Sequence, residues 1–365
     1  MNQRGFIRPA VDRIPAFGGV PTCDTAGMAG QAFLHLNECP YPPSPRVVEA
    51  ITHGAAGVNR YGEPRPQLLA ERLAQLAGVE ADRIVIGNGS DEVLAMIASA
   101  TLEAGDVAVA PTPSFPRYRI SAAIQGAQTR LVKLLLDGRN DVAGLLGAID
   151  GATRVVYCCT PNNPSGAPLE PEEIAHLCER VPADVLLVVD EAYAEFHRHE
   201  GGVDALPALA RRNGPWASVR TFSKAYALAG LRLGYAIVSD GAIAAALTKV
   251  KLNFNLSRIA VQAGLAALDD KEYADGLIAA MVVERERLAG SLAAMGFAPL
   301  PSRANFVSFD LRRPAMPVMA AMARRGVLVR EWRDPGYETY IRFSVGLPAE
   351  NDRAVAALRL ALGEA

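Results

Sequence analysis

The chain has few cysteines, no excess charge of either sign and no long apolar run, and each absence excludes a class of protein. Its five cysteines form no Cys-x-x-Cys pair, and its first residues show no basic flank followed by an apolar run, so we expect a reducing compartment, the cytoplasm. Lys and Arg number 37 against 39 Asp and Glu, which leaves no basic field for nucleic acid. No stretch reaches the roughly 20 apolar residues that cross a bilayer. A membrane or nucleic-acid partner is therefore not expected.

Metal-ligand patterns are equally sparse. The nearest approach to one is His197-x-His199, but no cysteine or carboxylate cluster with ligand spacing accompanies it. We therefore expect no metal site, and we interpret the two histidines as part of a solvated loop.

What the sequence does contain is a regular alternation of segments. Half of the 365 residues are hydrophobic, enough for one large core and a smaller one. From Pro66 onward, segments with helical spacing of apolar residues alternate with short apolar runs of strand length. Several runs are apolar on both faces, which is typical of a sheet covered by helices on both sides. The predicted strands are Ile84–Ile86, Val107–Ala110, Thr129–Leu135, Arg154–Cys158, Val185–Val189, Ser218–Thr221 and Gly234–Val238.

Four successive units are predicted. Residues 1–35 show no sustained period, and we expect an arm that packs with the small domain or with a partner chain. Residues 36–250 predict a large α/β domain with a doubly wound, mostly parallel sheet. Residues 251–295 contain two linking helices, Ile259–Leu268 and Lys271–Met295. Residues 296–365 predict a smaller α+β domain with strands Asn305–Phe309, Gly326–Arg330 and Tyr340–Val345 and helices Pro317–Arg325 and Asn351–Leu362.

Polar residues follow the predicted strands directly. In open α/β sheets, ligands bind beyond the carboxyl ends of the strands. The first strand is followed by residues 87–92, which are small or polar and are expected to open a helix at Val93 and direct free backbone N–H groups at an anion such as phosphate. Residues 160–166, 190–193 and 222–224 follow three further strands, and Arg232 lies eight residues beyond Lys224. The sequence therefore predicts a ligand site at this edge of the sheet.

These segments resemble the fold-type I pyridoxal-phosphate-dependent aminotransferases, and most of all the histidinol-phosphate aminotransferase family. Order and spacing agree over roughly residues 34–360, in segments 36–38, 59–61, 87–92, 161–166, 190–193, 221–235, 302–306 and 342–350. The resemblance implies pyridoxal 5'-phosphate as cofactor, small-molecule substrates and a homodimer with shared active sites. It also implies transfer of an amino group between histidinol phosphate and 2-oxoglutarate.

The same resemblance assigns roles to the residues around the cofactor ring. Lys224 matches the lysine that carries the cofactor as a Schiff base, and a desolvated lysine among cations has the lowered pKa that this requires. Asp190 matches the carboxylate that keeps the pyridine nitrogen protonated, so that the cofactor can act as an electron sink. Tyr193 and Asn163 match residues that hydrogen-bond to the ring hydroxylate, and Phe115 matches the aromatic residue that stacks on the ring.

Further residues are implied to hold the cofactor phosphate and the substrate. Those for the phosphate are Gly89, Ser90, Asp91, Thr221, Ser223 and Arg232, together with Tyr61 from the neighbouring subunit. Those for the substrate are Asn37, Tyr61, Asn163, Arg330 and Arg342. Among them, Arg342 matches the arginine that clamps the substrate carboxylate as a bidentate fork, and Arg330 matches one near the distal group of the substrate.

Other functions stay open at this point. An aromatic amino acid is an alternative donor, which would bind through apolar contacts near Phe17 and Tyr41. A decarboxylase or lyase of the same fold would use the same lysine and aspartate. A nucleotide-dependent oxidoreductase would need a full glycine fingerprint, and the third glycine after Gly87-x-Gly89 is missing. A regulator would need a DNA-binding segment, for which the first 35 residues are too short.

Overall fold

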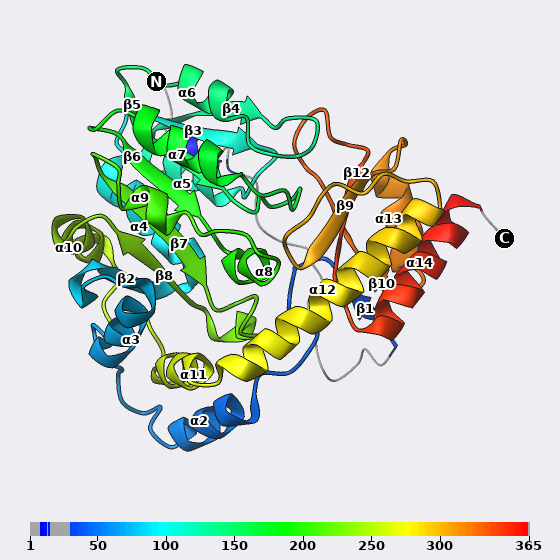
Figure 1. Cartoon of the computed structure of the whole chain (residues 1–365), viewed down its shortest axis with the longest axis horizontal. Helices are drawn as coiled ribbons and strands as arrows, with labels where there is room; N and C mark the ends of the chain where they lie inside the picture. Colours follow the sequence, from blue (N-terminus) through cyan, green and yellow to red (C-terminus); the bar gives the residue numbers. More distant parts are fainter. Residues whose placement is uncertain (1–7, 13, 15–29, 364–365) are drawn as a thin grey trace, which may run out of the picture.

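A seven-stranded sheet forms the centre of the larger part of the molecule (Figure 1), as seen in a computed structural model that describes residues 8–12, 14 and 30–363. Phe17 and Cys23 lie outside these residues. The strand order is β2-β8-β7-β6-β5-β3-β4, and β8 runs in the opposite direction to the other six strands. The strands are β2 (Ile84–Asn88), β3 (Val107–Thr112), β4 (Gln128–Lys133), β5 (Thr153–Cys159), β6 (Leu186–Asp190), β7 (Trp216–Thr221) and β8 (Leu233–Val238). This mostly parallel sheet confirms the predicted α/β fold.

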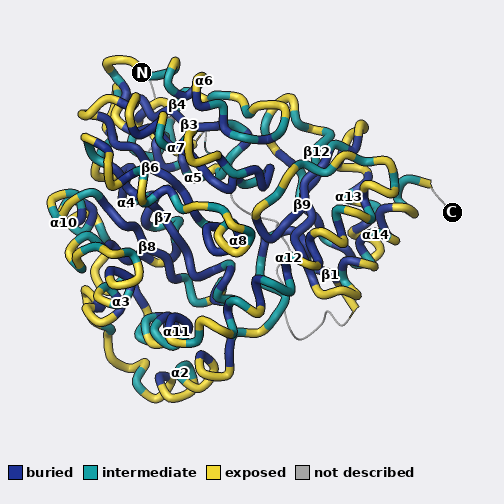
Figure 2. The backbone as a smooth tube through the Cα atoms, in the orientation of Figure 1, coloured by how far each residue is buried: buried dark blue, intermediate teal, exposed yellow. Residues whose placement is uncertain are grey.

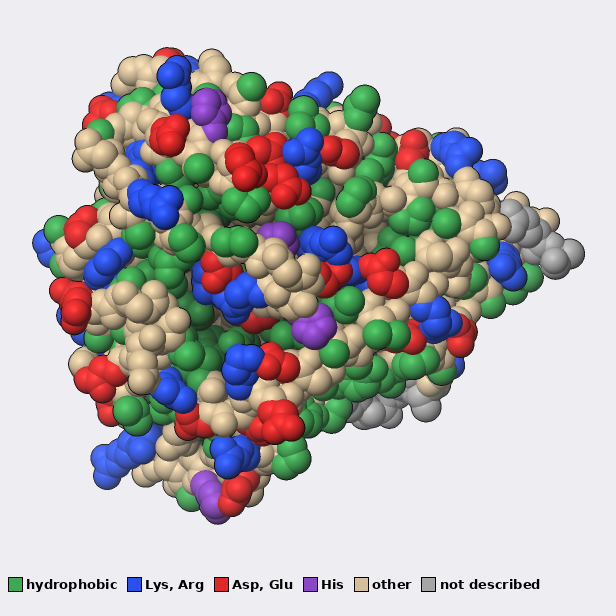
Figure 3. Space-filling view, in the orientation of Figure 1, with side chains coloured by type: hydrophobic (Ala, Val, Ile, Leu, Met, Phe, Trp, Pro, Cys, Tyr) green, Lys and Arg blue, Asp and Glu red, His purple; other side chains and the backbone are tan. Residues whose placement is uncertain are grey.

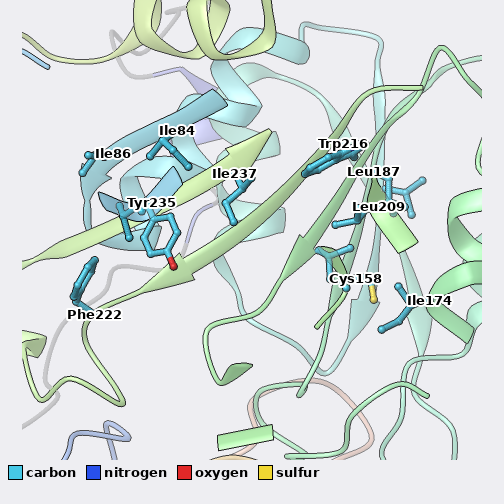
Figure 4. Packing of buried hydrophobic residues seen from close by; sticks show 14 of the residues in the cluster. Ile84, Ile86, Cys158, Ile174, Leu187, Leu209, Trp216, Phe222, Tyr235 and Ile237 are labelled. Atoms are coloured by element: carbon cyan, nitrogen blue, oxygen red, sulfur yellow. The ribbon is translucent and has the colours of Figure 1, made fainter. Parts of the chain in front are cut away.

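Except on the edge strand β4, alternate residues along the strands enter two different apolar cores, one on each face of the sheet. On β5, Cys158 packs in the first core and its neighbour Cys159 in the second. Figure 4 shows the first core, where strand residues such as Ile84 and Leu187 pack with helix residues such as Leu209. Its helices are α2 (Pro45–Ala55), α3 (Gln67–Ala77), α6 (Val142–Gly147), α7 (Pro171–Arg180), α9 (Leu206–Leu209) and α11 (Arg258–Leu268). The second core is closed by α4 (Gly89–Thr101), α5 (Arg117–Gln125) and α10 (Gly241–Val250).

A smaller unit lies beside the large one, and the long helix α12 (Lys271–Ala294) runs between them (Figure 1). Its sheet has the order β11-β12-β9, from β9 (Phe306–Asp310), β11 (Arg330–Glu331) and β12 (Tyr340–Ser344). Helices α13 (Ala315–Ala323) and α14 (Pro348–Leu362) pack in its core. Strand β1 (Ala32–Phe33) pairs with β10 (Val327–Leu328), so the chain just before residue 36 is bound to the small unit. Near the start of the chain, helix α1 (Pro9–Asp12) is four residues long.

Three local predictions differ from the structure. Helix α4 begins at Gly89 and not at Val93, because the acidic residues read as a preceding loop occupy its first turn, where negative charge is favourable. The predicted strand Gly326–Arg330 is two strands, since β10 pairs with β1 while β11 pairs with β12. His197 and His199 lie on the short helix α8 (Ala194–His199) and not on a loop.

The burial pattern follows this layering. Figure 2 shows the central strands as buried and the outer sides of α2, α3 and α10 as largely exposed. On the face drawn in Figure 3, acidic and basic side chains are interspersed. Within the described part of the chain, no helix has the length and apolar character to span a bilayer. Nor do the described histidine, cysteine and acidic residues include a group of three or more placed to hold a metal ion.

Candidate active site

The sheet order brings the predicted site residues to one edge. Strands β5, β6 and β7 are adjacent, so Asn163, Asp190 and Lys224, which follow or end them, come together. Strand β8 runs the opposite way, so its start meets the end of β7, and Thr221 pairs with Gly234. Strand β2 ends at the same edge, where Asn88 pairs with Leu233. The start of α4, which follows β2, therefore borders the same site.

Lys224 lies in the loop after β7, with its amine turned into this site. The Nζ donates a hydrogen bond to the Leu36 carbonyl at 3.1 Å. Burial, together with the charges of Arg342 and Arg232, lowers the pKa of Lys224 to about 8, against the opposing charge of Glu38. A lysine whose amine is neutral at moderate pH can attack an aldehyde, which is the property needed for a Schiff base.

Asp190 ends β6 and is 3% exposed. Its Oδ2 accepts a hydrogen bond from the Tyr118 hydroxyl at 2.7 Å, and its Oδ1 accepts one from the Ala192 N–H at 3.1 Å. Burial raises the pKa of Asp190 to about 6, although both hydrogen bonds lower it. A buried carboxylate of this kind is suited to pair with a protonated ring nitrogen.

The predicted phosphate site is a cup with no space for extra side chains. A Cβ on Gly89, whose φ is +77°, would lie 2.4 Å from Arg232 Nη2, and a Cβ on Gly234 would lie 2.3 Å from the Ser90 N. The first N–H groups of α4, at Ser90 and Asp91, therefore stay accessible, as anion binding at a helix start requires.

Polar side chains complete this cup. The Thr221 hydroxyl donates to the Ser223 Oγ at 3.0 Å. Arg232 adopts a left-handed backbone conformation, with φ of 54°, and its guanidinium lies 3.5 Å from both Ser223 Oγ and Asp91 Oδ2. The structure thus brings together all of the residues predicted to hold the phosphate within one chain. Their arrangement fits a dianion.

Arg342, on β12, faces Lys224 from the small unit. Its guanidinium donates to the Asn163 Oδ1 and, at 2.7 Å, to the His35 carbonyl, and it lies over the ring of Phe306. Its Nε is buried with no hydrogen-bond partner in the part of the chain that the structure describes. Burial lowers the pKa of Arg342 to about 10, and Tyr193 opposes this. Asn163 therefore contacts Arg342, in addition to the position predicted for it near the ring hydroxylate.

Asn37 and Tyr193 lie beside this arginine. The Asn37 side chain donates from Nδ2 to the Tyr193 hydroxyl at 3.0 Å, and burial raises the pKa of Tyr193. Asn37 has a φ of 54° and is held in that conformation by Ser344, whose Oγ accepts from the Asn37 N–H and donates to its Oδ1. Asn305 also donates to the Asn37 carbonyl at 3.0 Å. The position of Tyr193 is thus fixed from both units.

Arg330 lies directly opposite Arg342 in the antiparallel pair β11–β12. Opposed residues in such a pair project to the same face, with Cβ atoms roughly 5 Å apart. Among the described residues, neither arginine forms an ion pair with a carboxylate. The charge of Arg330 helps to lower the pKa of Arg342, and Glu331 opposes this. Two opposed cations without an ion-pair partner among the described residues form a candidate site for an anion.

Tyr61 does not face the site of its own chain. It is 80% exposed and stacks on Phe254 with ring centroids 4.5 Å apart. Phe115, by contrast, lies at the site, in the loop between β3 and α5, and meets Tyr118 edge-on at 6.0 Å. The adjacent Ser114 hydroxyl donates to the Asn162 Oδ1 at 2.7 Å, which ties this loop to the one after β5.

Sequence reasoning missed two polar contacts of the site. Tyr118 holds Asp190, and Ser344 holds Asn37. Neither residue directly follows a predicted strand, so the pattern of polar residues at strand ends does not include them. The closeness of Tyr118 to Phe115 in the sequence could have indicated that its ring lies near the site, but not that its hydroxyl meets Asp190.

The comparisons with known proteins agree with this geometry. The family model "Aminotransferase class I and II" matches residues 31–358. A histidinol-phosphate aminotransferase 3 of Rhizobium meliloti is 38% identical over 328 residues, which cover 90% of this chain and 89% of that one. An aromatic amino acid aminotransferase of Cutibacterium acnes is 37% identical, with coverage of 96% and 99%. The crystal structure of the Sinorhizobium meliloti histidinol-phosphate aminotransferase with pyridoxal-5'-phosphate has a TM-score of 0.85 at 32% identity, with 91% of each chain covered.

A doubly wound sheet with a lysine of low pKa, a buried aspartate and a phosphate cup at one edge defines a pyridoxal-phosphate-dependent transferase. Within that class, the chain belongs to the class I and II aminotransferases. It is a transaminase that acts on small molecules, and its cofactor is pyridoxal 5'-phosphate.

Proposed function

We propose that the enzyme moves an amino group between histidinol phosphate and 2-oxoglutarate. The observation that carries the proposal is the opposed pair Arg330 and Arg342, which offers two unneutralised cations on one face of a strand pair. Histidinol phosphate carries a dianionic phosphate, and 2-oxoglutarate carries two carboxylates. Guanidinium forks fit either anion, so one pair of arginines can serve both half-reactions. Several relatives named histidinol-phosphate aminotransferase support this choice.

In this reaction, each residue of the site would have a separate role. Bound pyridoxal phosphate supplies an electron sink for the bond that breaks at the substrate Cα. Lys224 accepts the Cα proton on its Nζ and returns it, which its pKa of about 8 suits at moderate pH. Asp190 holds the ring nitrogen protonated, and Tyr193 and Asn163 hydrogen-bond to the ring hydroxylate. Arg342 fixes the substrate anion, so that the Cα proton lies within reach of Lys224.

An aromatic amino acid is the second candidate donor. The relative named aromatic amino acid aminotransferase matches 96% of this chain, and partly buried apolar residues after Asn37 favour this donor. Cys39 and Tyr41 pack against the cluster that contains Tyr193 and Phe306. In that case Arg342 alone would hold the donor carboxylate, and Arg330 would contribute little.

Turnover of Arg330→Ala separates the two donors. With histidinol phosphate, kcat/KM should fall by about 2 kcal/mol or more, as expected when a charge-assisted hydrogen bond is lost. With phenylalanine, the substitution should have little effect. Arg324→Ala is the matched control, because it removes the same charge from an exposed position after α13. A wild-type enzyme that turns over phenylalanine far better than histidinol phosphate would overturn the proposed donor.

We further propose a homodimer in which Tyr61 reaches the partner's cofactor phosphate. Tyr61 belongs to an exposed apolar surface made by two loops that Lys251 joins through a hydrogen bond to the Pro64 carbonyl. The exposed apolar residues of these loops are Val58, Tyr61, Leu252 and Phe254, and they are flanked by Leu68 at the start of α3 and Val250 at the end of α10. An apolar surface of this kind is typical of a subunit interface.

Mixed dimers test the shared site. A Tyr61→Ala chain paired with a Lys224→Ala chain contains one intact site, so equal mixing should restore about a quarter of wild-type activity, since half of the dimers are mixed. Mixing Lys224→Ala with Asp190→Asn is the control, because both residues lie in the same chain's site and no intact site forms. Equal recovery in both mixtures, or in neither despite proven subunit exchange, would contradict the shared site.

We also propose the arm 1–35, the domains 36–250 and 296–365 and the linking segment 251–295 as the working units of the enzyme. The separate cores of the large and small sheets support this division. The cytoplasm is the proposed location, which the unpaired cysteines Cys39, Cys158, Cys159 and Cys178 support.

A further inference from the structure

Tyr118 has no part in the roles given above, although it contacts Asp190 directly. It lies in the first turn of α5, is 1% exposed, and donates its hydroxyl to the Asp190 Oδ2 at 2.7 Å. Its ring is fixed by two other aromatic rings, stacking on Tyr157 at 4.7 Å and meeting Phe115 edge-on. These two ring contacts therefore hold the Tyr118 hydroxyl in place against Asp190.

The surroundings of Asp190 explain why this hydrogen bond matters. Burial disfavours the ionised carboxylate, and the other acidic groups that face it have the same effect. The titratable groups around Asp190 are Tyr118 on α5, Cys158 and Cys159 on β5, Asp91 on α4, and Glu191 and Tyr193 after β6. Among the described residues, the Tyr118 hydroxyl and the Ala192 N–H are the main groups that favour the ionised form of Asp190. The hydrogen bond from Tyr118 has the larger effect on the pKa of Asp190.

We propose that Tyr118 is a positioning residue for the cofactor, holding Asp190 ionised and correctly oriented for the protonated ring nitrogen. A hydrogen bond to the charged form of an acid favours that form, and it also fixes the orientation of the carboxylate plane. Because the hydroxyl occupies Oδ2 and the Ala192 N–H approaches Oδ1, the carboxylate cannot rotate freely. The inference rests on the cofactor and not on the amino donor, so a binding measurement without substrate tests it separately from the proposed function.

The test is the affinity of the full-length, cofactor-stripped protein for pyridoxal phosphate, measured across pH. Tyr118→Phe keeps the ring and its stacking but removes the hydroxyl. At neutral pH the dissociation constant should rise roughly ten- to hundredfold, the range for a lost hydrogen bond to a charged group. The pKa of Asp190 should rise in the variant, so the ratio of variant to wild-type dissociation constants should shrink as pH increases.

Tyr157→Phe provides the matched control. Its hydroxyl is buried and has no hydrogen-bond partner among the described residues, and its ring stacks on Tyr118, so the substitution removes the same atom without touching Asp190. This variant should bind the cofactor like the wild type at every pH. In an Asp190→Asn background, Tyr118→Phe should have almost no further effect. An unchanged affinity in Tyr118→Phe, a loss that is equal at all pH values, or a full loss in the Asp190→Asn background would each overturn the inference.

Discussion

The low pKa of Lys224 leads to a measurable prediction about the cofactor-free protein. At pH 7 about one amine in ten is neutral at a pKa of about 8, against about one in three thousand at the ordinary value of 10.5, roughly a three-hundredfold difference. Since only the neutral amine attacks an aldehyde, the rate of cofactor capture should increase with pH up to about 8 and then level off.

Substitutions can separate the causes that lower the pKa of Lys224. Burial is the largest cause, and Arg342 and Arg232 are the cations that add to it. Arg342→Gln removes one of these charges and should therefore raise the pKa of Lys224 toward 10.5. Arg324→Gln removes an exposed charge after α13 and should leave the pKa of Lys224 unchanged.

Brief labelling with acetic anhydride, followed by peptide mass mapping, measures this pKa without the cofactor, because only the neutral amine reacts. The labelling rate of Lys224 between pH 6 and 11 should show a midpoint near 8 in the wild type. A midpoint above 10 in that protein, or no upward movement in Arg342→Gln, would refute the reasoning.

Two further substitutions test the ring and phosphate contacts. Asp190→Asn should retain some cofactor but lose about 4 kcal/mol of transition-state stabilisation, so a near-wild-type kcat would contradict the role of Asp190. Gly89→Ala should weaken cofactor binding, because the added Cβ would lie 2.4 Å from the Arg232 guanidinium and the φ of +77° disfavours alanine. Gly78→Ala is its control in equilibrium unfolding and cofactor titration, since it has a φ of +66° but no neighbouring atom within 4 Å.

Much of the fold could be predicted because the physical signal is local. The strands inside the large sheet alternate between two apolar cores, so runs that are apolar at every position, such as Val185–Val189, indicate a doubly covered sheet. The site residues at strand ends were predictable for a related reason. A change from apolar to polar residues, as at Asp190, indicates where a buried strand reaches the ligand edge.

Contacts that depend on tertiary geometry could not be predicted in the same way. The opposition of Arg330 and Arg342 is a matter of strand register, which the loop between β11 and β12 determines. The Tyr118 hydroxyl meets a carboxylate 72 residues away in sequence, and nothing in the sequence around α5 indicates that partner. Asn37 adopts its positive φ because Ser344 holds it from another strand.

The position of Arg342 links substrate binding to the protonation of Lys224. Arg342 is a buried cation with no carboxylate partner among the described residues, and its charge lowers the pKa of Lys224. An anion bound to Arg342 neutralises that charge, so the pKa of Lys224 must rise when the anion binds. By linkage, the anion must then bind more tightly when Lys224 is protonated. Arg342→Gln would remove this coupling together with the shift in pKa. The same arginine therefore selects an anionic substrate and increases the proton affinity of the amine that must accept the Cα proton.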